Sequence, residues 1–266
     1  AERSGRQMVG FRLVAVLLSL VAGGLFILAL GQNPLAVYAT ILKGAFRSKM
    51  AIQATVKYTV PLCICALGVT LAFKMRFWNI GGEGQLIMGG VFASFFALFC
   101  TGWNHWALLA AMFAAGALGG GLWGLLPAVF KSRWNTNETL FTLMLNYIAL
   151  YLVSYLQAGP WRDEAANGFN KIARFDKNAS LDKVFGVHFG WILMLVLVAL
   201  VWVYLKRTKQ GYEISVVGES QDTARYAGIH VKRVVLRTMF LSGAVAGLAG
   251  VCQVAGSDMT LSTVSY

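Results

Sequence analysis

Charged residues are scarce in this sequence of 266 residues. Asp, Glu, Lys and Arg together make up 13% of it, whereas soluble domains carry about a quarter. Hydrophobic residues make up 58% and fall in long runs, and residues 14–30 and 103–130 contain no charged side chain. Runs of this length cross the hydrocarbon core of a bilayer. The composition therefore excludes a soluble domain and predicts an all-α, polytopic transmembrane helical bundle.

Acidic residues are the scarcer of the two charge types, and the formal net charge is +12. Such a surplus can indicate a nucleic-acid partner. Here, however, the basic residues lie at the ends of hydrophobic runs and not on a soluble face interleaved with aromatic residues. We therefore expect these basic residues to lie at the surface of the lipid bilayer, and we expect no nucleic-acid partner.

Cysteine and histidine are too few and too scattered for a catalytic or metal site. The four cysteines all lie in apolar runs, which favours buried structural thiols: Cys63, Cys65, Cys100 and Cys252. The three histidines lie in three separate loops: His105, His188 and His230. No Gly-x-Ser-x-Gly elbow is present, and no Gly-Lys is followed by Ser or Thr as in a nucleotide P-loop. We expect no metal site, no enzymatic activity and no ATP hydrolysis by this chain.

The hydrophobic runs predict about seven spans in a single transmembrane domain covering residues 1–266. The expected spans are residues 11–30, 56–73, 86–101, 107–130, 139–157 and 191–205, and one that begins near Thr238. Residues 35–56 are mixed in character and favour an interfacial helix. Gly116, Gly120 and Gly124 recur at intervals of four, and 243, 247 and 250 are also glycines. Small residues on one helix face allow close helix packing in a membrane.

Basic residues indicate the orientation, because loops rich in Lys and Arg stay in the cytoplasm. Residues 1–10 carry Arg3 and Arg6, so we expect a cytoplasmic N-terminus. The longest polar connection, residues 206–237, carries seven basic residues and is expected on the same side. Residues 159–190 form the expected outer loop.

A short helix is expected inside the long connection. Ser220 is a suitable N-cap, Asp222 suits the first turn and Gly228 suits the C′ position. These signals predict about two turns over residues 221–227. Caps are common, so two interpretations stay open: a solvated loop, or a docking helix for a cytoplasmic protein.

A break in the helical pattern is expected at residues 74–85. Its glycines bracket one carboxylate in the run Gly81-Gly82-Glu83-Gly84, and glycine weakens helices. One interpretation is a cytoplasmic turn with a solvated Glu83. The other is a broken helix beside a translocation path, with Asn79, Glu83 and Gln85 turned inward. Asn146, in the middle of the fifth span, either bridges helices or faces a solute.

Several motifs, in order along the chain, carry a resemblance to a known family. They are residues 77–85 (FWNIGGEGQ), Asn137-Glu138 with 143–148 (LMLNYI), 159–163 (GPWRD), Arg207-Thr208 with Gly211-Tyr212, and 218–229 (GESQDTARYAGI). Together they resemble inner-membrane permeases of ABC importers in the branched-chain amino acid, ribose and simple-sugar superfamily. The purine-nucleoside and simple-sugar permeases are the most similar branch.

The resemblance implies two groups of site residues. Those of the substrate pathway are Asn79, Gly81, Glu83, Gly84, Gln85, Asn137, Glu138 and Asn146. Those that couple to the ATPase are Gly218, Glu219, Gln221, Asp222, Ala224, Arg225, Tyr226, Gly228 and Ile229. The family usually has Ala-Ala where this chain has Thr223-Ala224. Its members continue for several helices beyond the position of Tyr266, so we expect a missing C-terminal part.

The resemblance also implies partners. They are cytoplasmic ABC ATPase subunits that bind ATP and Mg²⁺, a second permease subunit, and an extracytoplasmic solute-binding protein. The expected function is the transmembrane pathway for a neutral polar solute, a nucleoside or simple sugar, in the bacterial inner membrane. The alternatives are an ion-coupled secondary carrier for a small polar solute, which would bury several ionisable groups mid-span, and a membrane scaffold.

Overall fold

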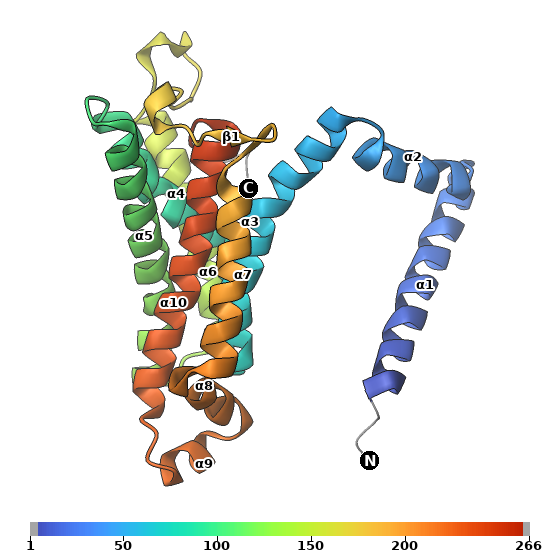
Figure 1. Ribbon diagram of the computed structural model, residues 1–266, viewed down its shortest axis with the longest axis vertical. Coiled ribbons are helices and arrows are strands. Elements are labelled where there is room, and N and C mark those ends of the chain that lie inside the picture. Colours follow the sequence, from blue (N-terminus) through green and yellow to red (C-terminus); the bar gives the residue numbers. More distant parts are fainter. Residues whose placement is uncertain (1–4, 263–266) are drawn as a thin grey trace. The chain divides into compact units, whose positions relative to one another are not determined.

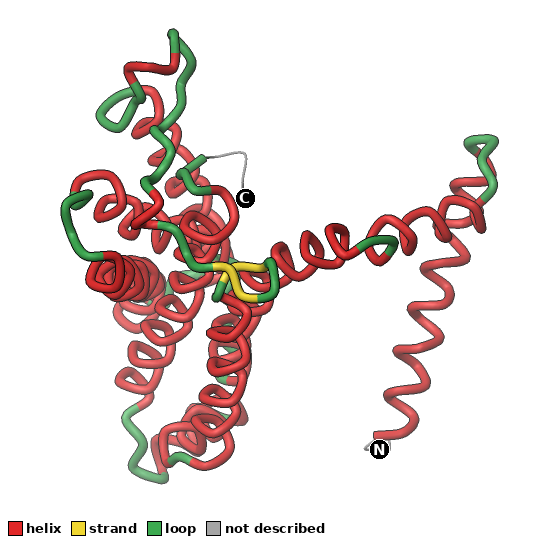
Figure 2. Tube along the Cα trace, turned by 45° about the horizontal axis from the view of Figure 1, so that its top comes forward, coloured by secondary structure: helices red, strands yellow, loops and turns green. Residues whose placement is uncertain are grey.

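A computed structural model describes residues 5–262 of the chain, and their side chains from Val9 onward. Arg3, which we expected on the cytoplasmic side, lies outside the described residues. Among residues 5–262, seven helices are long and apolar enough to cross a membrane, which confirms the all-α polytopic prediction (helices are red in Figure 2). The chain divides into two compact units, Ala1–Thr55 and Val56–Tyr266, and each is described by itself.

The first unit contains α1 (Gly5–Ala29), α2 (Pro34–Phe46) and the start of α3 (Lys49–Lys74). Tyr38 of α2 donates its hydroxyl to the carbonyl oxygen of Leu20 in α1, at 2.7 Å. The predicted interfacial helix over residues 35–56 is too long, because α2 ends at Phe46. The physical reason is Ser48, whose hydroxyl accepts the N–H of Ala51 at 3.2 Å and starts a new helix.

The second unit contains the rest of α3 and all later elements. These are α4 (Gly82–Phe99), α5 (His105–Trp134), α6 (Glu138–Ala158), α7 (Gly190–Arg207), α8 (Lys209–Glu219), α9 (Gln221–Tyr226), α10 (Val231–Val251) and the π-helix η3 (Cys252–Asp258). The predicted outer loop holds the 3-10 turns η1 (Glu164–Ala166) and η2 (Lys177–Ala179). It also holds an antiparallel pair of strands, β1 (Lys183–Val184) and β2 (Val187–His188).

Three helices of this unit, α4, α5 and α10, lie side by side along much of their length (Figure 1). Glycines make this possible. A Cβ on Gly120 of α5 would overlap the carbonyl oxygen of Gly243 in α10, and one on Gly247 would overlap that of Gly116. A Cβ on Gly250 would overlap the carbonyl oxygen of Leu86 in α4. The predicted small-residue packing is confirmed, with backbone in direct contact with backbone.

The last span begins earlier than predicted, at Val231 and not near Thr238. Lys232 and Arg233 suggested a loop in the sequence. In the structure these two side chains are exposed, whereas Val231, Val234 and Val235 are buried. The first turn of α10 is therefore amphipathic, and Lys232 and Arg233 occupy its outer face.

The helix α8 was not predicted at all, because its residues were assigned to a polar loop. The hydroxyl of Thr208 accepts the N–H of Gly211 at 3.1 Å and caps its first turn. Ile214 and Val217 are buried at 0% and 3% exposure. The cap, followed by apolar residues three apart, is the signal that could have found this helix.

The connections of this unit gather at two opposite ends. At one end Leu181 of the outer segment donates its N–H to the carbonyl oxygen of Ala255, and Phe175 donates to Met259, at 3.0 and 2.8 Å. At the other end lie α8 and α9 (Figure 1). This outer segment, residues 159–190, is therefore fastened to η3 and to Met259 just after it, beyond the end of α10 that lies away from α9.

Helix packing at Gly247 can be tested with a matched glycine pair. Gly247→Ala places a methyl group against the backbone of Gly116, and overpacking of this kind costs about 1–3 kcal/mol. Gly102→Ala is the control, because nothing lies within 4 Å of a Cβ there. Thermal unfolding of the purified protein in detergent should show a lower midpoint for Gly247→Ala alone. Equal midpoints for both variants would refute the packing role of Gly247.

Candidate functional site

The segment that interrupts the helical pattern lies between α3 and α4, at residues 75–81, which we call the break segment. Asn79 is 1% exposed, and so is Gln85 in the first turn of α4. Their amides bond reciprocally: Asn79 Nδ2 donates to Gln85 Oε1 at 3.2 Å, and Gln85 Nε2 donates to Asn79 Oδ1 at 3.1 Å. Asn79 Nδ2 also donates to the hydroxyl of Ser242 in α10, at 3.3 Å. The prediction of a break with Asn79 and Gln85 turned inward is confirmed.

Helix α6 supplies the remaining partners of this irregular backbone. The N–H of Ile80 donates to Thr142 Oγ1 at 3.3 Å, and its carbonyl oxygen accepts from Asn146 Nδ2 at 3.0 Å. Asn146 Oδ1 accepts the N–H of Gly84 at 2.9 Å. Asn146 therefore bridges α6 to the break segment and to α4. This is the first of the two roles that we considered for it, a bridge between helices. We call Asn79, Gln85, Thr142, Asn146 and Ser242 the amide cluster.

Two glycines of the motif leave room for the amide cluster. A Cβ on Gly84 would lie 2.8 Å from Asn146 Oδ1, and one on Gly81 would lie 3.0 Å from the Cβ of Thr142. Larger residues would separate α6 from the start of α4. Gly81 caps the start of α4 and Gly84 lies in its first turn, so these glycines serve close approach, whereas α3 has already ended at Lys74.

Glu83 does not turn inward, so that part of the prediction is wrong. Its side chain is exposed, and no ion pair of the described residues involves it. Gly82 faces Val69 and Cys65 of α3, and Gly84 faces Asn146. The helical turn leaves Glu83 on the remaining, outer side of α4.

The side chains of Asn137 and Glu138 do not join the amide cluster, although the Thr142 hydroxyl donates to the backbone carbonyl oxygen of Glu138 at 2.8 Å. Asn137 caps α6 and accepts the N–H of Leu140 at 3.2 Å. Glu138 pairs with Lys131 of α5 at 2.9 Å. The structure therefore gives both residues a role in the connection between α5 and α6. Two members of the amide cluster, Thr142 and Ser242, were not predicted from the sequence. Thr142 lies one helical turn before Asn146, and this spacing could have identified it. No feature of the sequence near Ser242 indicates its role.

The predicted short helix is present as α9, with both of its caps. Ser220 Oγ accepts the N–H of Thr223 at 3.2 Å. At the other end Gly228 has a positive φ of 75°. The N–H of Ile229 donates to the carbonyl oxygen of Ala224 at 2.9 Å, and that of Gly228 donates to Arg225 at 3.0 Å. This pair of bonds is the Schellman motif that the glycine predicted.

The helix α9 presents polar groups outward and one small residue inward. Ala224 is fully buried and belongs to the apolar cluster around Ile214. Tyr226 is 95% exposed, and Asp222 and Arg225 form an exposed ion pair at 3.0 Å. Of the other predicted coupling residues, Gly218 is buried, Ile229 is half-buried, and Glu219, Gln221 and Gly228 are exposed. Tyr226, Asp222 and Arg225 thus form a small protruding surface.

Helix α8 connects this surface to the break segment. Gly218 lies against the end of α3, where a Cβ would overlap the carbonyl oxygen of Lys74. The next residue, Glu219, lies 3.8 Å from Arg76 in an exposed ion pair. A displacement of α9 therefore reaches the first residues of the break segment through direct contacts.

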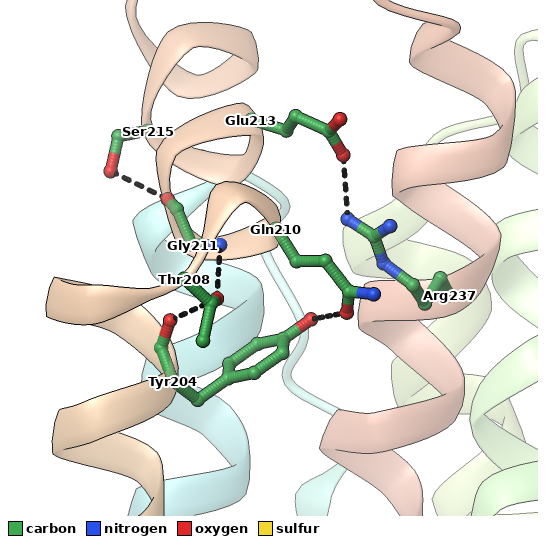
Figure 3. Close-up of polar contacts among 7 residues, drawn as sticks. All are labelled: Tyr204, Thr208, Gln210, Gly211, Glu213, Ser215 and Arg237. Carbon is green, nitrogen blue, oxygen red and sulfur yellow. Dashed lines mark hydrogen bonds and ion pairs between the residues drawn. The ribbon is translucent and has the colours of Figure 1, made fainter.

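Two polar contacts fasten α8 to its neighbours, as Figure 3 shows. Arg237 of α10 pairs with Glu213 of α8 at 3.0 Å, and their side chains are only 25% and 18% exposed. Tyr204 of α7 donates its hydroxyl to Gln210 Oε1 at 3.0 Å. Charge-assisted pairs of this kind fix geometry well. We call Glu213 and Arg237 the α8 clamp.

Comparison with known proteins decides the family. The model of the branched-chain amino acid transport system permease component matches residues 51–264. This chain belongs to that permease family. The glucose ABC transporter permease protein of Haloferax volcanii is 31% identical over 94% of this chain and 68% of its own length. The guanosine ABC transporter permease protein of Bacillus subtilis is 31% identical over 92% of this chain and 71% of its own length. No solved structure matches the chain.

Family membership settles several expectations. The protein is a multi-pass membrane permease of the ABC importer type, and it is a transport subunit, not an enzyme. The nucleoside ABC transporter permease protein of Lactococcus lactis is also similar, with 29% identity over 90% of this chain and 68% of its own length. The permease therefore is not the ion-coupled carrier that we considered as an alternative.

The bridging role of Asn146 predicts a stability loss. Asn146→Ala removes the partners of the Gly84 N–H and the Ile80 carbonyl oxygen. A buried polar group left unpaired costs about 1–3 kcal/mol, so we expect a clearly lower thermal unfolding midpoint. Ser154→Ala on the same helix is the control, because its exposed hydroxyl bonds only to its own turn. A midpoint for Asn146→Ala equal to that of the control would exclude the bridge.

The α8 clamp predicts a strong pairwise coupling. In a double-mutant cycle of Glu213→Gln and Arg237→Gln, we expect a coupling free energy of about 1.5–3 kcal/mol, the range for hydrogen bonds to charged groups. The matched cycle of Glu219→Gln and Arg76→Gln removes a pair that is 82% and 69% exposed. Exposed pairs contribute about 0–1 kcal/mol. Chemical unfolding in detergent measures both cycles; equal couplings would refute the clamp.

Proposed function

We propose that this permease forms the transmembrane pathway for a neutral polar solute, a nucleoside or simple sugar, and that a separate cytoplasmic ATPase drives it. The observation that supports this best is the continuous contact from α9 through α8 to the break segment. Such a path gives a motor outside the membrane a mechanical connection to irregular backbone inside the bundle.

The polar interior favours a neutral solute. The buried polar side chains of the described residues are amides, hydroxyls and one imidazole, with no Asp, Glu, Lys or Arg among them. Amides and hydroxyls donate and accept hydrogen bonds without charge, which suits hydroxyl-rich and nucleobase groups. The similar permeases are named for glucose, guanosine and nucleosides, which points to the same solute classes.

ATP hydrolysis would be coupled to transport by a contact between α9 and the ATPase that differs between the nucleotide states of the ATPase. The protruding surface of Tyr226, Asp222 and Arg225 would bind a groove on the ATPase, and the ATPase would hold it differently in its nucleotide states. Gly218 transmits the displacement to Lys74, while the α8 clamp transmits it to α10. Because a partner shifts an equilibrium only by its differential affinity for two states, this contact must change between outward-facing and inward-facing arrangements.

The remaining parts of the proposal concern assembly. A second permease subunit completes the pathway, and an extracytoplasmic solute-binding protein delivers the solute. ATP and Mg²⁺ bind to the ATPase, and this chain holds no cofactor. In a bacterial inner membrane the end that carries α8 and α9 faces the cytoplasm, as does the N-terminus. The basic residues of the connection around α9 support this orientation.

Solute-stimulated ATPase activity tests the proposal. The permease is reconstituted in vesicles with its ATPase and binding protein, and guanosine, adenosine, glucose and a charged amino acid are added in turn. We expect a nucleoside or a sugar to raise the ATPase rate and the charged amino acid to leave it unchanged. Accumulation of solute against its gradient by this permease alone, without an ATPase, would overturn the proposal.

Removal of the Schellman motif at the end of α9 should uncouple solute uptake from ATP hydrolysis. Proline at position 228 cannot adopt the positive φ of Gly228 and lacks the N–H that bonds Arg225. We expect Gly228→Pro to insert normally but to lose at least tenfold in ATP-driven uptake, since an ordered α9 is required. Gly168→Pro is the control, because Gly168 also has a positive φ, of 93°, in the outer segment. Equal uptake by Gly228→Pro and the control would contradict the coupling role.

A further inference from the structure

A cavity of about 670 Å³ opens between the end of α5 and the start of α10, beside α9. It is distinct from the amide cluster, with which it shares no residue. Its polar wall includes Lys131, Arg133, Asn135, Arg225, His230 and Lys232. We call it the basic cavity.

The charge of the basic cavity is only partly compensated. Four of its residues are cationic, and none is Asp or Glu. Lys131 pairs with Glu138, and Arg225 pairs with Asp222. Within residues 5–262 no carboxylate lies within ion-pairing distance of Arg133 or Lys232. Two cations therefore face the cavity with no protein counter-charge.

The other wall of the cavity is apolar and leads to the membrane-spanning part of the unit. Val231 and Val235 of α10 line it, together with Ile229. On α5, Trp134 is 61% exposed and lies beside the ring of Phe130, with 5.1 Å between centroids. Exposed tryptophans concentrate at the level of the lipid headgroups. Trp134 lies between two residues that line the cavity, Arg133 and Asn135, so the cavity adjoins the level at which a lipid headgroup is expected.

We propose that the basic cavity binds the phosphate of an anionic phospholipid, with Arg133 and Lys232 as its principal ligands. Basic pockets between membrane helices attract anionic headgroups, and guanidinium recognises phosphate oxygens with two parallel bonds. An acidic surface of a protein partner is the rival occupant. The contiguous apolar wall and the interfacial Trp134 favour the lipid, because a soluble acidic surface would not need them. The inference goes beyond the proposed function and does not depend on the solute.

Lipid binding to the full permease tests the inference. The dissociation constant is measured in detergent by native mass spectrometry for phosphatidylglycerol and for phosphatidylcholine of equal chain length. The test variant combines Arg133→Gln and Lys232→Gln. The matched control combines Lys206→Gln and Lys209→Gln, which removes the same charge from exposed lysines outside the cavity at the same end of the unit. All four side chains are exposed, and a thermal unfolding midpoint equal to that of the parent shows that each variant is folded.

We expect the parent and the control to prefer phosphatidylglycerol and the test variant to lose about thirtyfold in affinity for it, the effect of removing two interfacial cations. An equal loss in the control would overturn the inference, because any surface charge would then suffice. So would full displacement of the lipid by millimolar inorganic phosphate, which would identify a site for free anions. Unchanged lipid affinity with lost binding of the ATPase would assign the cavity to the protein partner instead.

Discussion

The arrangement of this permease depends on the direct backbone contact of α10 with α4 and α5. No hydrophobic effect drives helices together inside a bilayer, so close packing has to supply the attraction. Gly116, Gly120 and Gly247 allow this contact because they carry no side chain. With α10 held there, Ser242 comes within hydrogen-bond distance of Asn79, and Arg237 lies next to Glu213. Both the amide cluster and the α8 clamp are consequences of where the glycines place α10.

The sequence predicted the features that local chemistry decides. The caps of α9, a break within residues 74–85 and the small-residue packing were each predicted from residues close together in the chain, although the break lies at residues 75–81, before Gly82 and Gly84. Features that depend on distant neighbours were missed. Ser242 joins the amide cluster only because α10 folds back on α4, and α8 persists because Ile214 and Val217 find a buried surface. The error on Glu83 has the same origin, since a break in a helix does not fix which side its carboxylate faces.

The amide cluster explains how irregular backbone is tolerated within the bundle. Unpaired N–H and carbonyl groups away from water are costly. Here Thr142 and Asn146 bond the backbone around Ile80, and Asn79 bonds its own segment at Gly81. Side-chain bonds of this kind, unlike a helical ladder, can be exchanged singly. The backbone of the break segment around Ile80 and Gly81 is therefore satisfied by side chains, whereas a regular helix would satisfy it through its own carbonyl groups.

Arg225 belongs at once to the protruding surface of α9 and to the wall of the basic cavity, which links the two sites. Its guanidinium pairs with Asp222, and an anion in the cavity would compete with that carboxylate. An occupant that alters how firmly α9 is held must alter its affinity for a partner. By thermodynamic reciprocity, the partner then changes the affinity of the cavity for its anion by the same factor. If both proposals hold, the lipid and the ATPase act on one short helix, and the binding of each depends on the other.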